Sequence, residues 1–124
     1  MKERRPVMDF GNVIVKKSAI GQFKEVDGLG VFANRDFKKG EIVVRWNIKI
    51  ISQGEYERLP KYEQYYFCHK RDGKIYLYPD PGRHVNRSEA PNAVADFKKE
   101  ADVALRDIKK GEEISIHKET KEDF

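Results

Sequence analysis

The sequence predicts a mostly β domain made of many short strands. Three observations predict this class: short runs rich in β-branched and aromatic residues recur along the chain, glycine-containing turn signals separate these runs, and helical spacing is confined to residues 52–67. The length of 124 residues allows one small domain. A two-domain enzyme is therefore excluded, and we expect any active site to be shallow or shared with a partner.

The expected strands follow one another at short intervals. They cover residues 13–15, 31–33, 42–51, 74–78, 93–97, 101–105 and 114–117. The turn signals between them are Asp27-Gly28, Lys39-Gly40, Asp72-Gly73 and Lys110-Gly111. Because glycine adopts positive φ angles without strain, each of these pairs favours a tight reversal of the chain.

The helical stretch has recognisable ends. Ser52 precedes Glu55 at the spacing of a capping box, which begins a helix, and Pro60 divides the stretch into two short helices. The following residues 79–92 carry almost no pattern of secondary structure. A patternless segment of this length in a small domain indicates either a functional loop or disorder.

One sequence motif occurs twice, once in each half of the chain, and we call this repeat the echo. Residues 35–42 and 106–114 share Arg-Asp, an apolar residue, Lys-Lys-Gly-Glu and a later isoleucine. Lys-Lys-Gly-Glu alone is typical of a surface turn, but both copies also have matching flanks. The echo therefore predicts two similar β-units that pack together.

Composition limits the classes of function. The chain has 25 basic and 21 acidic residues, a net charge of +4, and interspersed signs, which permits a nucleic-acid partner without requiring one. The lone cysteine, Cys68, excludes an internal disulfide and a cysteine-rich zinc cluster, and predicts a reducing, intracellular setting. The three histidines lie in separate segments, so no metal site is expected. No apolar run approaches the length of a membrane span, so we expect no membrane-spanning segment.

Four motifs in a fixed order carry more specific information about function than the composition does. They are residues 28–33, residues 35–41, residues 83–88 with Pro91-Asn92, and residues 106–114. Together they resemble a SET domain, the family of protein-lysine methyltransferases, in the minimal form of viral and bacterial members. The resemblance covers a SET-like domain at residues 13–118, between an N-terminal extension at 1–12 and a short C-terminal tail at 119–124.

The resemblance implies a SET-domain (β-clip) fold of several small sheets, short helices and a C-terminal pseudoknot, in which the C-terminal segment passes beneath the Asn86 loop. It also implies S-adenosylmethionine as cofactor and a lysine of a protein substrate, such as a histone or other basic protein, as methyl acceptor. Nucleic acid is not required, and a second copy of the chain could complete the site. The cofactor contacts carry over onto Asp27, Gly28, Leu29, Asn86 and Arg87.

The implied reaction needs a narrow apolar channel. A lysine amine attacks the methyl group only when neutral, and its ordinary pKa is near 10.4, so aromatic walls beside a cationic cofactor must lower that pKa. Tyr65 is the best match to the family's channel tyrosine, and the resemblance places the predicted catalytic positions at Tyr65 and Lys118. Further predicted lining residues are Tyr66, Tyr76, Tyr78 and Phe124.

Two departures from the family pattern leave alternatives open. Arg87 replaces the usual histidine after Asn86, and Lys118 stands where relatives have a catalytic tyrosine. A lysine there would repel a cationic cofactor by about 4 kcal/mol at 4 Å if the effective dielectric constant is about 20. The first alternative is a degenerate SET-like domain that binds peptide or cofactor without turnover. The second is a non-enzymatic β-clip module of the SAF type, which would not require the loop from Asn86 to Asn92.

Overall fold

The computed structural model describes residues 7–18 and 28–120, which form three sheets and a few short helices. The strands are β1 (Met8–Asp9), β2 (Val13–Lys17), β3 (Leu29–Ala33), β4 (Ile42–Arg45), β5 (Lys49–Ile51), β6 (Cys68–Arg71), β7 (Lys74–Leu77), β8 (Asn86–Ser88), β9 (Ala93–Asp96), β10 (Ala101–Ala104) and β11 (Glu113–His117). The helices are α1 (Gln53–Arg58), α2 (Lys61–Phe67) and the 3-10 helix η2 (Gly82–His84). The mostly β class is confirmed.

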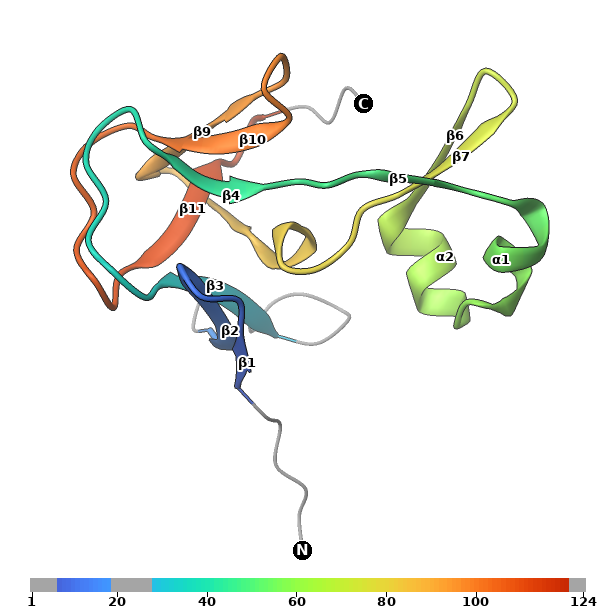
Figure 1. Cartoon of the computed structure of the whole chain (residues 1–124), viewed down its shortest axis with the longest axis horizontal. Coiled ribbons are helices and arrows are strands. Elements are labelled where there is room, and N and C mark those ends of the chain that lie inside the picture. The colour runs from blue at the N-terminus through green and yellow to red at the C-terminus, as the bar shows by residue number, and fades with distance from the viewer. Residues whose placement is uncertain (1–6, 19–27, 121–124) are drawn as a thin grey trace, which may run out of the picture.

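The three sheets divide the molecule into two ends. One sheet has the order β1-β2-β3-β11-β8, a second β4-β10-β9 and a third β5-β7-β6. Figure 1 shows the third sheet and both α-helices at one end of the molecule, and the other two sheets at the other end. Residues between β4 and β5, and between β7 and η2, connect the two ends.

The hydrophobic core joins the first two sheets. Its buried side chains come from β2, β3, β4, β9, β10 and β11, with Phe37 and Ile108 fully enclosed. Strand β2 shows how the alternation places them, since Val13 and Val15 are buried while the residues between and after them are not. In the part of the chain that the structure describes, no helix is long and apolar enough to span a membrane.

The helical stretch forms as predicted. The Ser52 hydroxyl accepts a hydrogen bond from the Glu55 backbone N–H at 3.0 Å, and the Glu55 carboxylate accepts one from the Ser52 N–H at 2.8 Å. This capping box begins α1, and Pro60 separates α1 from α2. Both predictions are confirmed.

The strand predictions differ from the structure where local pattern is weak. The single run expected at 42–51 is two strands in different sheets, because residues 46–48 interrupt it and the φ of Asn47 is 52°, outside the range of a β-strand. Strands β1, β6 and β8 are not predicted, since their sequences are short and largely polar. Residues 8–9 of the expected N-terminal extension form β1, which pairs with β2.

The sequence echo forms two reciprocal turns. Phe37 and Ile108 exchange backbone hydrogen bonds of 2.8 Å in both directions. The Asp107 carboxylate accepts from the Lys39 N–H at 2.9 Å, and the Asp36 carboxylate accepts from the Lys110 N–H at 2.8 Å. The glycines of the two copies have φ values of 92° and 98°. The two halves therefore build matching β-units that pack together, as the echo predicts.

Removing either aspartate should destabilise the domain to a similar extent. We expect Asp36→Ala and Asp107→Ala each to lower the free energy of unfolding by about 1 kcal/mol, because each leaves one backbone N–H of the opposite turn without its acceptor. Urea denaturation measures this difference. Glu57→Ala is the matched control, since that exposed carboxylate bonds only a side chain of its own helix, Gln53. Unequal effects of the two aspartate variants would contradict the reciprocal arrangement.

The C-terminal strand is held by the loop that the resemblance singles out. β11 pairs antiparallel with β3 and parallel with β8, so that Ser115 lies opposite Asn86. Asn92 adds a bond on each side, donating to the Glu113 carbonyl at 2.8 Å and accepting from the Ser115 N–H at 2.9 Å. The segment 86–92 thereby ties the C-terminal strand into the first sheet.

Candidate functional site

A polar junction fixes β3, β8 and β11 to one another. The buried Asn86 amide nitrogen donates to Glu113 Oε2 at 2.9 Å, to the Leu29 carbonyl at 3.0 Å and to the Ser18 hydroxyl at 3.2 Å. The Ser18 hydroxyl in turn lies 2.7 and 2.8 Å from the two Glu113 carboxylate oxygens. Asn86 is thus a structural crosslink, and its amide hydrogens already have partners within the protein.

Glycine is required at the centre of this junction. A Cβ at Gly30 would lie 2.3 Å from Glu113 Oε2, 2.7 Å from Ser18 Cβ and 3.0 Å from the Asn86 amide nitrogen. Real Cβ atoms do not approach other atoms so closely. The Gly-Leu-Gly motif therefore serves close packing at Gly30, while Gly28 supplies a positive φ of 70° at the entry to β3.

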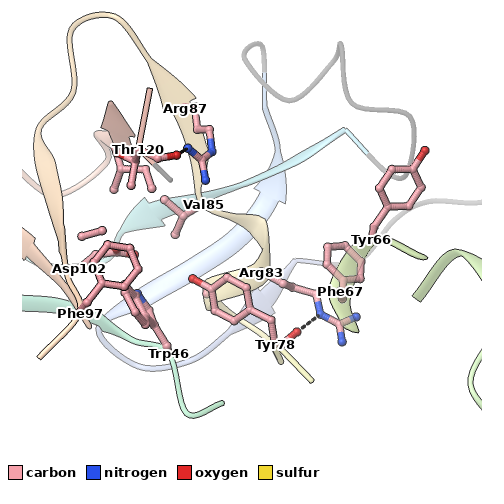
Figure 2. A pocket seen from close by; sticks show the side chains of 13 residues that line it. Trp46, Tyr66, Phe67, Tyr78, Arg83, Val85, Arg87, Phe97, Asp102 and Thr120 are labelled. Atoms are coloured by element: carbon pink, nitrogen blue, oxygen red, sulfur yellow. Dashed lines mark hydrogen bonds between the residues drawn. The ribbon is translucent and has the colours of Figure 1, made fainter. Parts of the chain in front are cut away.

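A cavity lies where the second sheet, the C-terminal strand and α2 meet. We call it the aromatic pocket; Figure 2 shows its side chains. Its volume is about 80 Å³, which exceeds the roughly 10–15 Å³ that one water needs. It is lined by Trp46, Tyr66, Phe67, Tyr78, Gly82, Arg83, Val85, Arg87, Ala95, Phe97, Asp102, Ile116 and Thr120.

Strand register places an acid beside aromatic rings. Asp102 on β10 pairs with Ala95 on β9 and with Val44 on β4. Trp46 lies two positions after Val44, and Phe97 lies two positions after Ala95. Because side chains alternate along a strand, both rings lie on the same face as Asp102. The Trp46 and Phe97 rings contact edge to face, with centroids 5.1 Å apart. The second sheet therefore presents one carboxylate and two rings to the pocket.

The opposite wall adds further rings and two arginines. The Tyr78 ring lies edge to face with Trp46 at 6.3 Å. Arg83 stacks its guanidinium 4.3 Å from the Phe67 ring centroid and pairs with Glu63 at 3.1 Å. Arg87 donates to the Thr120 carbonyl oxygen. Thus Arg83 has an acidic partner, and Arg87 is tied to the chain that follows β11.

Asp102 has the most perturbed environment of the pocket. It is 1% exposed, and burial raises the pKa of its carboxyl from 3.8 to about 7, while the Trp46 N–H and the Arg87 charge act in the opposite direction. Among the described residues, neither carboxylate oxygen accepts a hydrogen bond of normal geometry. Asp102 is therefore a buried acid that can change protonation state near neutral pH.

The structure brings some of the predicted channel residues to this pocket and leaves others outside. Tyr66 and Tyr78 line it, as does Arg87, which is predicted as a cofactor contact. Tyr65 and Tyr76 do not line it; the Tyr65 side chain is 79% exposed, and its ring lies edge to face with that of Tyr66 at 4.7 Å. Predicted residues Asp27 and Phe124 lie outside the described residues.

Lys118 is directed away from the pocket. Its ammonium pairs with Glu89, and both side chains are exposed. Its backbone N–H donates to the Ser88 carbonyl at 3.0 Å, which extends the pairing of β11 with β8. The charge repulsion expected from a lysine in the tyrosine position therefore does not act inside the pocket.

Two buried residues that line the aromatic pocket, Trp46 and Asp102, are not among the predicted site residues. The available signal for Asp102 is a charge inside the otherwise apolar strand Ala101–Ala104, since an acid is rarely buried without a partner. Trp46 is the only tryptophan of the chain and directly follows β4. Trp46 and Asp102 lie close together only because β4 and β9 pair with β10, and no local sequence pattern reveals that pairing.

Comparison with known proteins decides the family. The family model described as the SET domain matches residues 28–117, which is most of the chain. The chain belongs to the SET-domain family. This SET domain therefore falls within a family of protein-lysine methyltransferases whose members generally use S-adenosylmethionine. The match includes β3, the Asp102 strand, and Asn86 and Glu113 of the polar junction, whereas Ser18 lies outside it.

Solved structures support the same fold. A candidate histone methyltransferase of Plasmodium falciparum is 24% identical, with a TM-score of 0.60, over 89% of this chain and 95% of that chain. At this identity the similarity shows the fold alone. A humanized mutant of the Chaetomium thermophilum Polycomb Repressive Complex 2 bound to the inhibitor GSK126 is 26% identical, with a TM-score of 0.54, over 85% of this chain and only 14% of that chain. A comparison of this chain with curated proteins finds no significant match.

Proposed function

We propose that the protein is an S-adenosylmethionine-dependent protein-lysine N-methyltransferase of the minimal SET type, and that the aromatic pocket receives the target lysine. The observation that carries this proposal is the buried Asp102 carboxylate surrounded by Trp46, Phe97 and Tyr78 in a SET-family chain. The expected substrate is a lysine of a histone or another basic protein.

The pocket has the chemistry that a lysine side chain needs. Aromatic faces attract cations and also cover the apolar methylene stem, whereas a buried carboxylate attracts the ammonium group. Among the lining residues, Trp46, Asp102 and Ile116 are buried, while Tyr66 and Phe97 are exposed. The exposed rings form a rim and the buried groups a floor, which suits a ligand that enters with its charged end first.

The residues present also fit a cationic methyl donor. When bound, S-adenosylmethionine supplies a methyl group on a sulfonium, which the same rings and carboxylate would attract. Arg87 would hold the carboxylate of that cofactor, and the backbone of Gly28 and Leu29 would approach it. The carbonyls of Gly28 and Leu29 already accept hydrogen bonds from the Ser18 N–H and the Asn86 amide, respectively.

The residues of the chain perform the remaining steps of this proposal. The rim rings exclude water from the amine. The ammonium gives up its proton to the Asp102 carboxylate, whose pKa is about 7, and the neutral amine then attacks the methyl group. The polar junction holds β3 and β8 at fixed separation, so that cofactor and pocket keep their relative position. Lys118 takes no part, because its ammonium is paired with Glu89 outside the pocket.

A binding module without turnover is the second candidate. The observation that favours it is the absence of a tyrosine at position 118, so no phenol from that position touches the reacting atoms. Such a module would use the same pocket to hold a lysine side chain of a partner protein. The two candidates differ in whether a methyl group moves.

The test is transfer of a radiolabelled methyl group from S-adenosylmethionine to a mixture of core histones, with the modified residue identified by mass spectrometry. We expect label on lysine. Calorimetric titration with S-adenosylhomocysteine accompanies it. Binding of S-adenosylhomocysteine without transfer to any basic protein would favour the second candidate, and absence of both would contradict the methyltransferase.

A further inference from the structure

The Asp102 carboxylate is incompletely paired by the residues that the structure describes. Neither of its oxygens accepts a hydrogen bond of normal geometry from the described residues, although the Trp46 N–H is near enough to influence it. Burying an acid in this way is unfavourable, and such groups cluster at sites where a ligand completes their environment. The missing partner is therefore a group that carries positive charge and donates hydrogen bonds.

The charged and titratable neighbours leave room for that partner. The arginines lining the pocket are Arg83 from η2, which pairs with Glu63, and Arg87 from β8, which donates to the Thr120 carbonyl. The titratable phenols are those of Tyr66 and Tyr78. The faces supplied by β4, β9 and β11 contribute Trp46, Ala95, Phe97 and Ile116, which carry no charge.

We infer that Asp102 is the specificity-determining residue of the aromatic pocket, and that it restricts the pocket to alkylamines that keep at least one N–H. This inference rests on the proposed function, because it concerns the same pocket and its lysine. The bound ammonium donates a hydrogen bond to the carboxylate, which is stronger for a charged pair than for a neutral one. The unmethylated, monomethylated and dimethylated forms of lysine satisfy this requirement, and a trimethylammonium group does not.

The requirement for an N–H follows because the aromatic rings and the Asp102 carboxylate attract a cation in different ways. Aromatic rings attract any cation, whatever its methylation, so rings alone would hold a trimethylammonium group well. The carboxylate distinguishes the forms, because a trimethylammonium group fills the floor while leaving both Asp102 oxygens without a donor. A SET domain with this floor should therefore add methyl groups only as far as the dimethylated product.

Amine binding should also depend on pH. The carboxylate attracts an ammonium only when ionised, and its pKa of about 7 means that it is mostly protonated at pH 5.5 and mostly ionised at pH 8. Apparent affinity scales with the ionised fraction. We therefore expect an alkylammonium to bind at least about tenfold more tightly at pH 8 than at pH 5.5.

The experiment uses the fluorescence of Trp46, which is the only tryptophan of the chain and lines the pocket. The 124-residue chain is titrated with n-butylammonium and with n-butyltrimethylammonium at both pH values and constant ionic strength. The variants are Asp102→Asn, which removes the charge but keeps the shape, and Glu89→Gln, which removes a charge from the exposed surface. Neither titration requires a methyl donor.

The expected result at pH 8 is a preference for n-butylammonium of at least about tenfold in the wild type, retained by Glu89→Gln and lost in Asp102→Asn. Equal affinities in the wild type, retention of the preference by Asp102→Asn, or no response to either cation would overturn the inference. If the preference holds while histones receive no methyl group, the methyltransferase alone fails. If histones receive three methyl groups on one lysine, this inference alone fails.

Discussion

Gly30→Ala is expected to lower the free energy of unfolding by about 3 kcal/mol, the upper part of the usual range for overpacking a tightly packed site. The new Cβ would lie 2.3 Å from Glu113 Oε2 and 2.7 Å from Ser18 Cβ. The Glu113 carboxylate cannot simply move aside, because both Ser18 and Asn86 donate to it. The substitution therefore either distorts β3 or breaks the junction that holds β8 and β11.

Urea denaturation followed by circular dichroism measures this effect. Gly54→Ala is the matched control, since Gly54 lies on α1 and a Cβ there would have ordinary contacts of 3.7 Å or more. Alanine is also the better helix former, so the control should be neutral or stabilising. A Gly30→Ala variant as stable as the wild type would show that the junction is looser than the structure implies.

Asp102→Asn is expected to stabilise the protein above neutral pH. Burial holds the pKa of the folded carboxyl at about 7, whereas the unfolded chain has a pKa near 3.8. Between these values the folded state keeps a proton that the unfolded state has released, so wild-type stability falls as pH rises from about 4 to about 7. A shift of this size corresponds to at most about 4 kcal/mol, and the buried asparagine amide offsets part of that gain.

The net expectation is a variant more stable than wild type by about 2 kcal/mol at pH 8, with little difference at pH 4. Thermal or urea unfolding of both proteins across this range gives the difference directly. Subtracting the two curves cancels the contribution of carboxylates such as Glu41, Glu55 and Glu112, whose pKa values are lowered by backbone hydrogen bonds. A difference that is constant with pH would contradict the burial of an ionisable Asp102.

Local signals in the sequence predict the parts of the fold that neighbouring residues determine. The capping box at Ser52, the break at Pro60 and the matching turns at Gly40 and Gly111 form as expected, because each depends on a few adjacent residues. Strand β8 escapes prediction, because Asn86–Ser88 is polar and becomes a strand only by pairing with β11. Its structure is therefore determined by a distant part of the chain.

In the candidate site too, features that depend on adjacent residues could be predicted, and features that depend on distant strand pairing could not. The family motifs point to Asn86 and the Gly-Leu-Gly turn, which meet in the structure, although as a packing junction with internal hydrogen bonds. Trp46 and Asp102 meet only because β4 and β9 flank β10 in a particular register. A shift of one residue in that register would turn Asp102 to the opposite face, so no local pattern could assign it.

The most direct test of the proposed lysine pocket compares two neighbouring tyrosines in the histone methyl-transfer assay. Tyr66 lines the aromatic pocket, whereas Tyr65 beside it is 79% exposed. We predict methyl transfer to lysine by the wild type, a KM for the protein substrate raised about three- to tenfold in Tyr66→Ala, and a KM unchanged in Tyr65→Ala. No transfer by the wild type, or a loss in Tyr65→Ala that Tyr66→Ala does not share, would contradict the assignment of this pocket.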